Sequence, residues 1–335
     1  MKKTAPSIRQ SHLPVSQEQE ALRQYLQAST SANTRKAYAS AIRQFEKWGG
    51  RLPTDSDTLT RYLLAQAQRL NSRSLTLHLT AISQWHRYQE LPDPAQTPMV
   101  RKTLEGIRRQ HGQPKRKAKA LRLEHIAAMA SHLQSDTHAN TKAKPDLKKK
   151  RDLAMVLTGF FGALRRSELV ALQAEDLTWE PEGLIIRLAR SKTDQQGSGI
   201  SRAIPKGAPG CCPCAAIQQW LDASGIQQGP LFRPINRWGQ LRAKALPANA
   251  VNDLLKQLGR ELNFDFVPEL SSHSLRRGMS TSAARANVDF ELIKKQGGWK
   301  SDATVWEYIE EGRQLQDNAA TPLMQALAEQ MKQEK

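Results

Sequence analysis

The chain has few cysteines and no long apolar run, and each shortage excludes a class of structure. Only three cysteines occur in 335 residues, and Cys211, Cys212 and Cys214 all fall in one proline-containing segment. No second Cys/His pair stands at metal-ligand spacing, so we expect reduced thiols and no tetrahedral zinc site. The longest nearly apolar segment, Leu153 to Leu164, is too short to cross a bilayer and predicts a buried helix.

Acidic residues are also scarce relative to basic ones. The chain has 32 Asp plus Glu against 50 Lys plus Arg, which gives a net charge of +18 with neutral histidine. This imbalance favours a polyanionic partner, with nucleic acid first, over a neutral metabolite, although charge alone also fits a ribosome-associated or merely basic protein. The basic N-terminal sequence lacks the apolar run of a secretory signal, so we expect a cytoplasmic protein with no membrane partner.

Composition and apolar periodicity divide the chain into four stretches. Residues 1–15 lack periodicity and contain two prolines, which predicts a flexible leader. Residues 16–110 repeat apolar positions at helical spacing and predict a compact bundle of short helices. Residues 111–120 are densely basic without an apolar face, and predict a linker that is either simply solvated or crosses a phosphate backbone. Residues 121–335 form the second predicted domain.

The second domain is predicted to be mainly helical with a small antiparallel sheet at one edge. Two segments with alternating side chains, Leu184–Arg190 and Ile200–Ile204, flank the loop-forming stretch 194–199 and predict a pair of strands. Helical patterns return from Ala215 and continue nearly to the end. The expected fold class is therefore mainly α, with a helical bundle followed by an α+β domain. The polar, lysine-rich stretch 137–150 has no assigned role.

Four residues near the end of the chain could assemble around one phosphate. His273, Arg276, Trp299 and Tyr308 follow one another at intervals of 3, 23 and 9 residues. If they do assemble, Tyr308 is a nucleophile. Taken alone, the pattern has a plainer interpretation, because a tyrosine in an amphipathic helix is usually a core residue and an HxxR pair is usually solvated.

A second charged group follows the apolar helix at 153–164. The segment from Gly162 places Arg165, Arg166 and Glu168 close together. Because buried charge is costly unless it is paired, this segment alone favours a salt bridge from Glu168 to Arg165 or to Arg166 over a catalytic role.

Together these segments resemble the signatures of the tyrosine recombinases, the phage integrase family. The stretch from Gly162 to Leu169 is similar to the first signature, His273 with Arg276 to the second, and Trp299 followed by Tyr308 to the third. Most of the family has histidine at the position of Trp299, so the chain looks most similar to the subgroup that contains Cre recombinase. The resemblance covers nearly the whole chain, since residues 31–38 look like the family's core-binding domain and residues 212–221 like the helix after its catalytic hairpin.

The resemblance implies a set of active-site residues: Arg165, Lys192, His273, Arg276, Trp299 and Tyr308, with Glu168 as a supporting carboxylate. The planar fork of arginine binds phosphate oxygens without losing its proton, and a tyrosine nucleophile needs help to ionise, for which His273 is suited. Lys192 on the hairpin would protonate the leaving 5′ oxygen, and Trp299 would donate its indole N–H to a phosphate oxygen. Arg166 and Arg277 are rejected, because the signature places the functional arginines elsewhere.

The implied function is site-specific DNA recombination through a 3′-phosphotyrosyl intermediate and a Holliday junction, without metal, ATP or any other cofactor. The resemblance implies double-stranded DNA with inverted-repeat half-sites as the partner, and a homotetramer on DNA that is a monomer or weak dimer without it. It also implies a bacterial, phage-borne or plasmid-borne protein associated with the nucleoid. Two alternatives remain open at this point: a type IB topoisomerase, and a DNA-binding protein that has lost catalysis.

The remaining predictions concern the tail and the DNA contacts. Leu323, Leu327 and Met331 form one apolar stripe in a C-terminal helix, which either packs on its own domain or, as we favour, docks into a neighbouring protomer. DNA contacts are expected from the helices at 31–48 and 71–90 and from the linker. The candidate residues are Arg35, Lys36, Arg73, His78, Lys115, Arg116 and Lys117.

Overall fold

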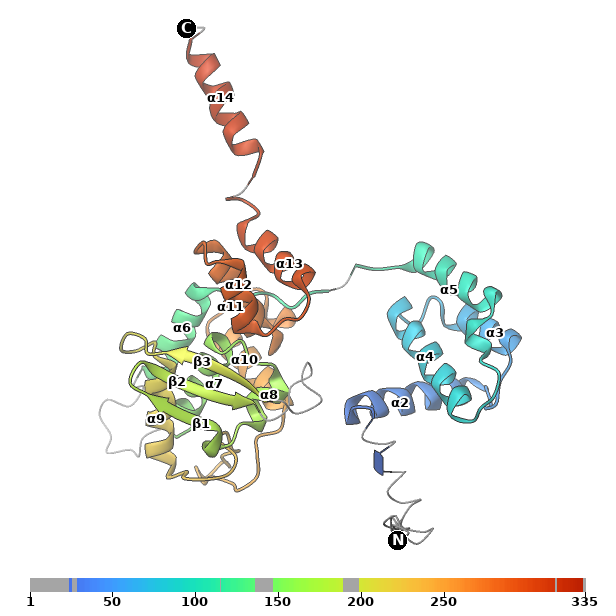
Figure 1. Ribbon diagram of the computed structural model, residues 1–335, viewed down its shortest axis with the longest axis horizontal. Coiled ribbons are helices and arrows are strands. Elements are labelled where there is room, and N and C mark those ends of the chain that lie inside the picture. The colour runs from blue at the N-terminus through green and yellow to red at the C-terminus, as the bar shows by residue number, and fades with distance from the viewer. Residues whose placement is uncertain are drawn as a thin grey trace, which may run out of the picture. The chain divides into compact units, whose positions relative to one another are not determined.

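The computed structural model of the protein describes residues 24–25, 29–114, 116–135, 147–188, 199–316 and 318–333 (Figure 1). The chain forms two compact units, the first ending at Arg116 and the second beginning at Lys117. None of the described helices is both long enough and apolar enough to cross a membrane.

The first unit is a bundle of helices around an apolar core. Its described helices are α2 (Ala32–Trp48), α3 (Ser56–Gln66), α4 (Ser72–Tyr88), η1 (Pro94–Gln96) and α5 (Pro98–His111). Short polar side chains cap the first three: Ser31, Asp55 and Asn71 each accept a hydrogen bond from a backbone N–H of the first turn. Gly49 ends α2 with a φ of 112°, a backbone angle that suits glycine.

His78 is a core residue of this bundle, so the prediction that it lies at the DNA-contacting surface is wrong. Its side chain is 4% exposed, and its Nδ1 lies 2.6 Å from the hydroxyl of Tyr62. Burial lowers the pKa of His78, which favours the neutral ring. The position follows from helical spacing, because His78 shares one face of α4 with the buried residues Leu75, Leu79 and Ile82.

The second unit is mainly helical and contains a small sheet, which confirms the predicted fold class. Its elements are α6 (Leu123–Gln134), α7 (Leu147–Phe161), α8 (Arg166–Ala171), η2 (Ala174–Asp176), β1 (Leu177–Glu180), β2 (Gly183–Leu188), β3 (Ile200–Pro205), α9 (Pro213–Ser224), α10 (Asn249–Glu261), η3 (Val267–Glu269), α11 (His273–Arg285), α12 (Phe290–Gly297), α13 (Asp302–Arg313) and α14 (Ala320–Gln333).

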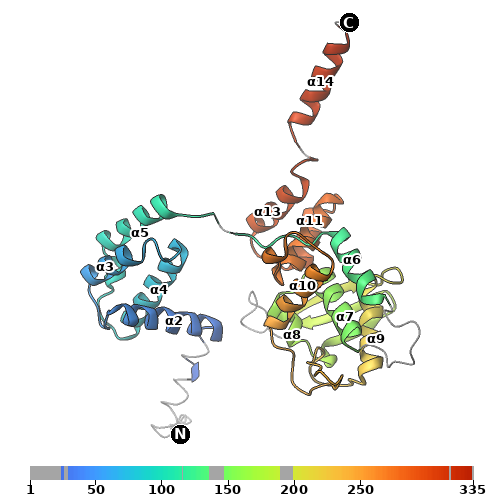
Figure 2. The same ribbon diagram turned by 180° about the vertical axis from the view of Figure 1, so that it is seen from behind.

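The sheet is antiparallel in the order β1-β2-β3, and helices α7 and α9 lie on one face of it (Figures 1 and 2). The buried residues Leu184, Ile186 and Leu188 alternate along β2 as the sequence predicted. Strand β1 was not expected, because it has four residues and most of them are exposed, so it shows no alternation. Residue Arg202 of β3 pairs with Ile186 and occupies a buried position.

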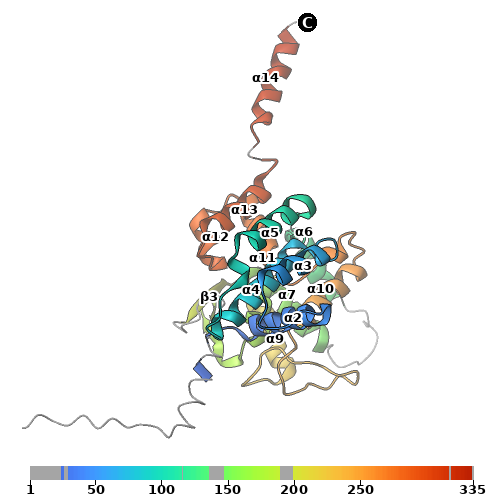
Figure 3. The ribbon, with the colours of Figure 1, turned by 90° about the vertical axis from the view of Figure 1, so that its right-hand side faces the viewer.

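Helix α7 runs through the middle of this unit, and ten consecutive residues from Arg151 to Phe160 are buried. It begins at Leu147, before the predicted apolar segment. The sequence did not predict this first turn, because the turn is rich in lysine and carries no apolar pattern. Helices α11, α12 and α13 pack together, and α11 also packs against α7 (Figures 1 and 3).

Two further predictions from the sequence concern the cysteines and the C-terminal helix. All three cysteines are free thiols, and Cys212 caps the start of α9 by accepting a hydrogen bond from the N–H of Ala215. Residues 320–332 of α14 are all exposed, including its apolar stripe. Within the described part of the chain α14 therefore does not bury its stripe on its own domain.

Candidate active site

The turn between α7 and α8 presents Arg165 and holds it with a carboxylate. Arg165 precedes α8, and the buried Glu168 accepts from its backbone N–H at 2.8 Å and from its Nη1 at 2.6 Å. The two residues fold together locally because Glu168 stands in the first turn of α8, where a carboxylate can satisfy a free backbone N–H. Arg166 instead donates to the side chain of Asn249. The structure thus selects Arg165 as the partner of Glu168.

Arg276 lies in the first turn of α11 and fixes two other segments. Its side chain is 2% exposed, its Nη1 donates to the carbonyl oxygen of Ala163, and its Nη2 donates to that of Gly297 at 2.6 Å. Burial, with a smaller contribution from the positive charge of Arg165, lowers the pKa of Arg276 to about 10. The guanidinium therefore stays protonated at neutral pH, in a position where its geometry is set by carbonyl groups.

Trp299 packs between Arg276 and Tyr308. The guanidinium of Arg276 lies 4.2 Å from the centre of an indole ring, and the Trp299 and Tyr308 ring centres are 5.2 Å apart. Residue 297 must be small for this arrangement, since a Cβ there would lie 1.6 Å from the Trp299 ring. The pair Gly297–Gly298 thus allows the tryptophan to fold back over the end of α12.

Tyr308 lies on α13 and is 4% exposed. Its hydroxyl is 3.4 Å from Nε2 of His273, which stands at the start of α11. Burial raises the pKa of Tyr308, while the charges of Arg276 and Arg277 oppose that increase. The phenol is therefore held beside a proton acceptor and two cations, which is the environment that a tyrosine nucleophile requires.

The structure thus brings together six of the predicted residues in the second unit: Arg165, Glu168, His273, Arg276, Trp299 and Tyr308. Lys192 and Lys115 lie outside the described residues. Arg35 and Lys36 on α2, Arg73 on α4, and Arg116 are exposed. Lys117 is also exposed and forms an ion pair with Glu307, the neighbour of Tyr308.

Two further arginines stand beside this cluster. Arg277 lies 5.6 Å from the centre of the Tyr308 ring and pairs with Glu311 on α13. No sequence signal shows this contact, because Arg277 and Glu311 are far apart in the chain. Arg202 is buried on β3, and its charge acts on Arg276. The alternation Ile200, Arg202, Ile204 did place an arginine on the buried face, so this residue could have been found from the sequence.

Metal ligation has no obvious site here. Across the described ranges, which omit residues 136–146 and 189–198, no group of three His, Cys, Asp or Glu side chains lies close enough to hold a metal ion.

Comparison with known proteins gives a consistent family. The sequence profile of the phage integrase family matches residues 119–314. An integrase/recombinase XerD homolog of Selenomonas ruminantium is 36% identical over 304 residues, which cover 88% of this chain and 86% of that protein. Cre recombinase of Escherichia phage P1 is 25% identical over 78% of this chain and 77% of its own length. The lower identity to Cre supports the predicted subgroup only loosely.

Solved structures have a similar fold. The XerH site-specific recombinase bound to a palindromic difH substrate gives a TM-score of 0.59 at 15% identity, covering 85% of this chain and 78% of that chain. The Tn1549 transposon integrase in complex with transposon right-end DNA also gives 0.59 at 15% identity, over 93% of this chain and 98% of that chain. Likeness at this level of identity concerns the fold alone, whereas the profile and the XerD homolog establish the relationship. The chain belongs to the phage integrase family of tyrosine recombinases.

Proposed function

We propose that this protein recombines DNA at specific sites by cutting and rejoining strands through a covalent bond between Tyr308 and a 3′ phosphate. The observation that carries the proposal is the position of the Tyr308 hydroxyl. It lies 3.4 Å from Nε2 of His273, and the cations Arg276 and Arg277 act on its ionisation. A buried phenol with a plain core role needs neither neighbour.

Arg165 and Arg276 would bind the nonbridging oxygens of the phosphate under attack. Negative charge develops on these oxygens in the transition state, and donors that are already fixed in place stabilise it without reorganising. Glu168 fixes Arg165, and the carbonyl oxygens of Ala163 and Gly297 fix Arg276. Both guanidinium groups are thus oriented before DNA binds.

The cleavage step would transfer two protons, one from the attacking tyrosine and one to the leaving 5′ oxygen. His273 accepts the proton of Tyr308 as the tyrosine oxygen bonds to phosphorus, and the bond from phosphorus to the 5′ oxygen breaks. Lys192, which lies outside the described residues, is assigned to protonate that leaving oxygen. A second 5′-hydroxyl can then attack the phosphotyrosyl bond and reverse the step. Because the phosphotyrosyl bond conserves the energy of the broken phosphodiester, the exchange needs no ATP.

Double-stranded DNA with inverted-repeat half-sites is the proposed substrate. The net charge of +18 supports a polyanionic partner, and the exposed Arg35, Lys36 and Arg73 lie on the helices assigned to DNA contact. Residues 16–110 are proposed as a DNA-binding domain and residues 121–335 as the catalytic domain, with the basic stretch 111–120 between them.

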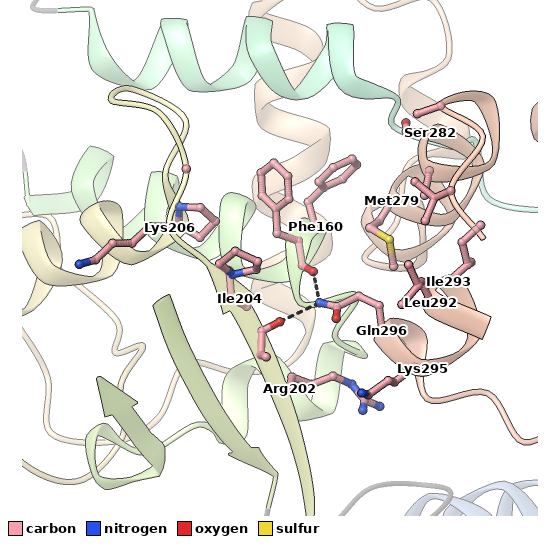
Figure 4. Close-up of a pocket in the computed structure, with 18 of the residues that line it drawn as sticks. Phe160, Arg202, Ile204, Lys206, Met279, Ser282, Leu292, Ile293, Lys295 and Gln296 are labelled. Carbon is pink, nitrogen blue, oxygen red and sulfur yellow. Dashed lines mark hydrogen bonds between the residues drawn. The ribbon is translucent and has the colours of Figure 1, made fainter. Parts of the chain in front are cut away.

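We further propose that four protomers assemble on DNA and exchange strands in pairs through a Holliday junction. The support is a helix whose apolar side chains are exposed and an apolar groove in the same unit. Leu323, Met324, Leu327 and Met331 of α14 are 57–69% exposed. A groove of about 920 Å³ lies between β3, α7, α11 and α12 (Figure 4). The labelled apolar residues in it include Phe160, Ile204, Met279 and Ile293.

A tail that fills the groove of the next protomer would make a head-to-tail contact. Such contacts close into a ring when the rotation between subunits fits, so a single kind of contact would suffice for a tetramer. In such a ring the α14 helix of each protomer would be held by its neighbour. Because α14 follows the helix that carries Tyr308, this contact would couple the active sites of adjacent protomers.

The test is to trap the covalent intermediate. Binding selection from a random duplex pool would supply the target site, and a nicked duplex that carries it would prevent religation. We expect the parent protein and the control Tyr88→Phe, which changes an exposed tyrosine, to form a DNA adduct that survives denaturation. Tyr308→Phe should bind the duplex and form none.

Each other outcome has a distinct meaning. An adduct with Tyr308→Phe would show that Tyr308 is not the nucleophile. Binding without any adduct from the parent would mean a DNA-binding protein without catalysis. If the parent forms the adduct and relaxes supercoiled plasmids that carry two sites, yet yields no recombinant product, the topoisomerase alternative is correct.

A further inference from the structure

Arg202 occupies a position on β3 that the sheet's pattern reserves for an apolar side chain. The residues Arg202 and Ile204 face the core, while Ser201 and Ala203 face outward. Its partner across the sheet is the buried Ile186. The arginine side chain is 5% exposed, so its charge is enclosed by protein. A leucine or methionine would satisfy the packing, and the charge therefore calls for a separate explanation.

The guanidinium of Arg202 is poorly satisfied in the free protein. Its Nη1 makes a long hydrogen bond of 3.4 Å to the carbonyl oxygen of Ser201. Its Nε and Nη2 are buried and find no hydrogen-bond partner in the part of the chain that the structure describes. Burying a cation without a partner is strongly unfavourable, so this guanidinium calls for an explanation such as a catalytic role or an anion that binds beside it.

The side chain points toward the proposed phosphate site. A Cβ on Gly298 would lie 1.8 Å from Nη2 of Arg202, so the guanidinium sits directly against the turn that precedes Trp299. Burial lowers the pKa of Arg202. The negative charge of Glu168 raises this pKa, and the positive charge of Arg165 lowers it. Arg202 in turn acts on the pKa of Arg276.

The charges around this point do not balance. Arg165, Arg202 and Arg276 lie close enough to act on one another, and Glu168 is the carboxylate that acts on both Arg202 and Arg276. Among the described residues that act on Arg202 and Arg276 in this way, one carboxylate thus faces three guanidinium groups. The missing negative charge is what a phosphodiester would supply on binding beside Arg165 and Arg276. In the close-up, Arg202 of β3 and Lys295 and Gln296 of α12 face the same space (Figure 4).

We propose that Arg202 is a positioning residue of the recombination site, which acts from behind Arg165 and Glu168 and against the Gly298–Trp299 turn. Its uncompensated charge raises the positive potential where the scissile phosphate binds, and its contact with Gly298 holds Trp299 in place. The inference rests on the proposed function. Arg202 also couples strand β3, through its charge, to the arginines that are proposed to bind the phosphate.

The test compares Arg202→Met, which keeps the apolar stem and removes the charge, with Arg202→Lys, which keeps the charge. The control is Arg187→Met, which changes an exposed arginine on the neighbouring strand. Single-turnover cleavage of a nicked target duplex is measured with an ordinary scissile phosphate and with an uncharged methylphosphonate at the same position. The thermal midpoint of each protein is measured in parallel.

We expect Arg202→Met to cleave the ordinary substrate roughly 10-fold to 100-fold more slowly, a smaller loss than removal of a direct oxyanion donor produces. Half-site binding and thermal midpoint should be unchanged or higher, because an unpaired buried charge has been removed. Arg202→Lys should recover most of the rate. With the methylphosphonate the Arg202→Met deficit should become clearly smaller, since the ground-state charge is gone and only one nonbridging oxygen is left to take up charge in the transition state.

Three results would overturn the proposal. Arg202→Met could cleave at the parent rate, could slow both substrates equally, or could lose thermal stability in proportion to its loss of rate; the last two outcomes would indicate a purely structural role. If the parent protein forms no adduct on either substrate, the proposed function itself is wrong, and the role of Arg202 falls with it. That result is distinct, because it does not depend on residue 202.

Discussion

The ionisation of Tyr308 is governed by charged residues on two packed helices. Burial raises its pKa, Arg276 and Arg277 lower it, and Glu307 and Glu311 raise it. Arg277 and Glu311 also pair with each other, so each limits the influence of the other. Substitutions in this pair should therefore change the pKa of Tyr308 without altering a residue that is proposed to bind the phosphate.

Replacing Arg277 by methionine should slow cleavage at neutral pH. The loss of a cation disfavours the phenolate, so the pKa of Tyr308 rises and the alkaline increase in cleavage rate moves to higher pH. We expect cleavage at pH 7 to be roughly tenfold slower and to recover as the pH is raised. The measurement is the single-turnover rate of adduct formation between pH 6 and about 10, a range set by the ordinary pKa of tyrosine.

The matched control should shift the pH dependence of cleavage in the opposite direction. Glu311→Gln removes an anion that raises the pKa of Tyr308, so its rate profile should move to lower pH. If both substitutions shift the profile in the same direction, the effect comes from disturbed packing of α11 on α13 and the electrostatic explanation is incorrect.

At the residue scale, the sequence was a good guide where contacts are local. Glu168 and Arg165 are three positions apart, so their pairing could be expected from spacing. Spacing alone left Arg166 open as the partner, whereas the family signature favoured Arg165, which the structure pairs with Glu168. His78 has a polar ring but stands on the apolar face of α4, and that face determines its burial. The contact of Arg277 with Glu311 depends on how α11 packs on α13, and no short-range pattern encodes that.

Elements followed the sequence where their apolar period was strong. Helices α2 and α4 have polar caps and clear periodicity, and both were expected close to their observed bounds. Strand β1 and the first turn of α7 were missed, since four mostly exposed residues and a run of lysines give no apolar period. Their structure depends on pairing with β2 and on packing within the second unit.

The end of α12 offers a prediction at this scale. Gly298 and Gly225 both end helices with positive φ, at 61° and 68°, but only a Cβ at Gly298 would meet another group, Arg202. Alanine at either position should therefore cost about 1 kcal/mol of stability from backbone strain. Only Gly298→Ala should also slow cleavage, because it displaces the Arg202 guanidinium and the Trp299 turn.

Thermal unfolding and single-turnover cleavage of both variants provide the measurement. Equal cleavage rates for Gly298→Ala and Gly225→Ala would show that the space beside Arg202 has no bearing on catalysis. The displaced Arg202 adds to the cost at Gly298, so a cleavage rate of Gly298→Ala that falls only in proportion to its folded fraction would indicate that the turn is needed mainly for folding.

At the scale of the whole molecule, the exposed stripe of α14 has to be explained. Four large apolar side chains on one helix form a surface that soluble proteins generally bury against a partner. The groove beside β3 and α12 is apolar and open in the same chain. A head-to-tail contact uses both surfaces once per protomer, and four such contacts satisfy all of them only in a closed ring.

Mixing two defective variants tests this assembly. The tail variant replaces Leu323, Leu327 and Met331 by serine, and the groove variant replaces Leu292, which lines the groove and is 59% exposed, by aspartate. On half-site duplexes, each variant alone should remain as one protomer per duplex, since burial of the stripe supplies the contact energy. The parent and the control Glu329→Gln, on the opposite face of α14, should form tetramers of defined mass in sedimentation.

An equal mixture of the two variants should form pairs and nothing larger. The intact tail of the groove variant fits the intact groove of the tail variant, but the reciprocal contact is broken, so a ring cannot close. Packing of α14 on its own chain predicts a different result, because mixing would then change nothing. Tetramers from the tail variant alone would show that the subunits associate through another surface.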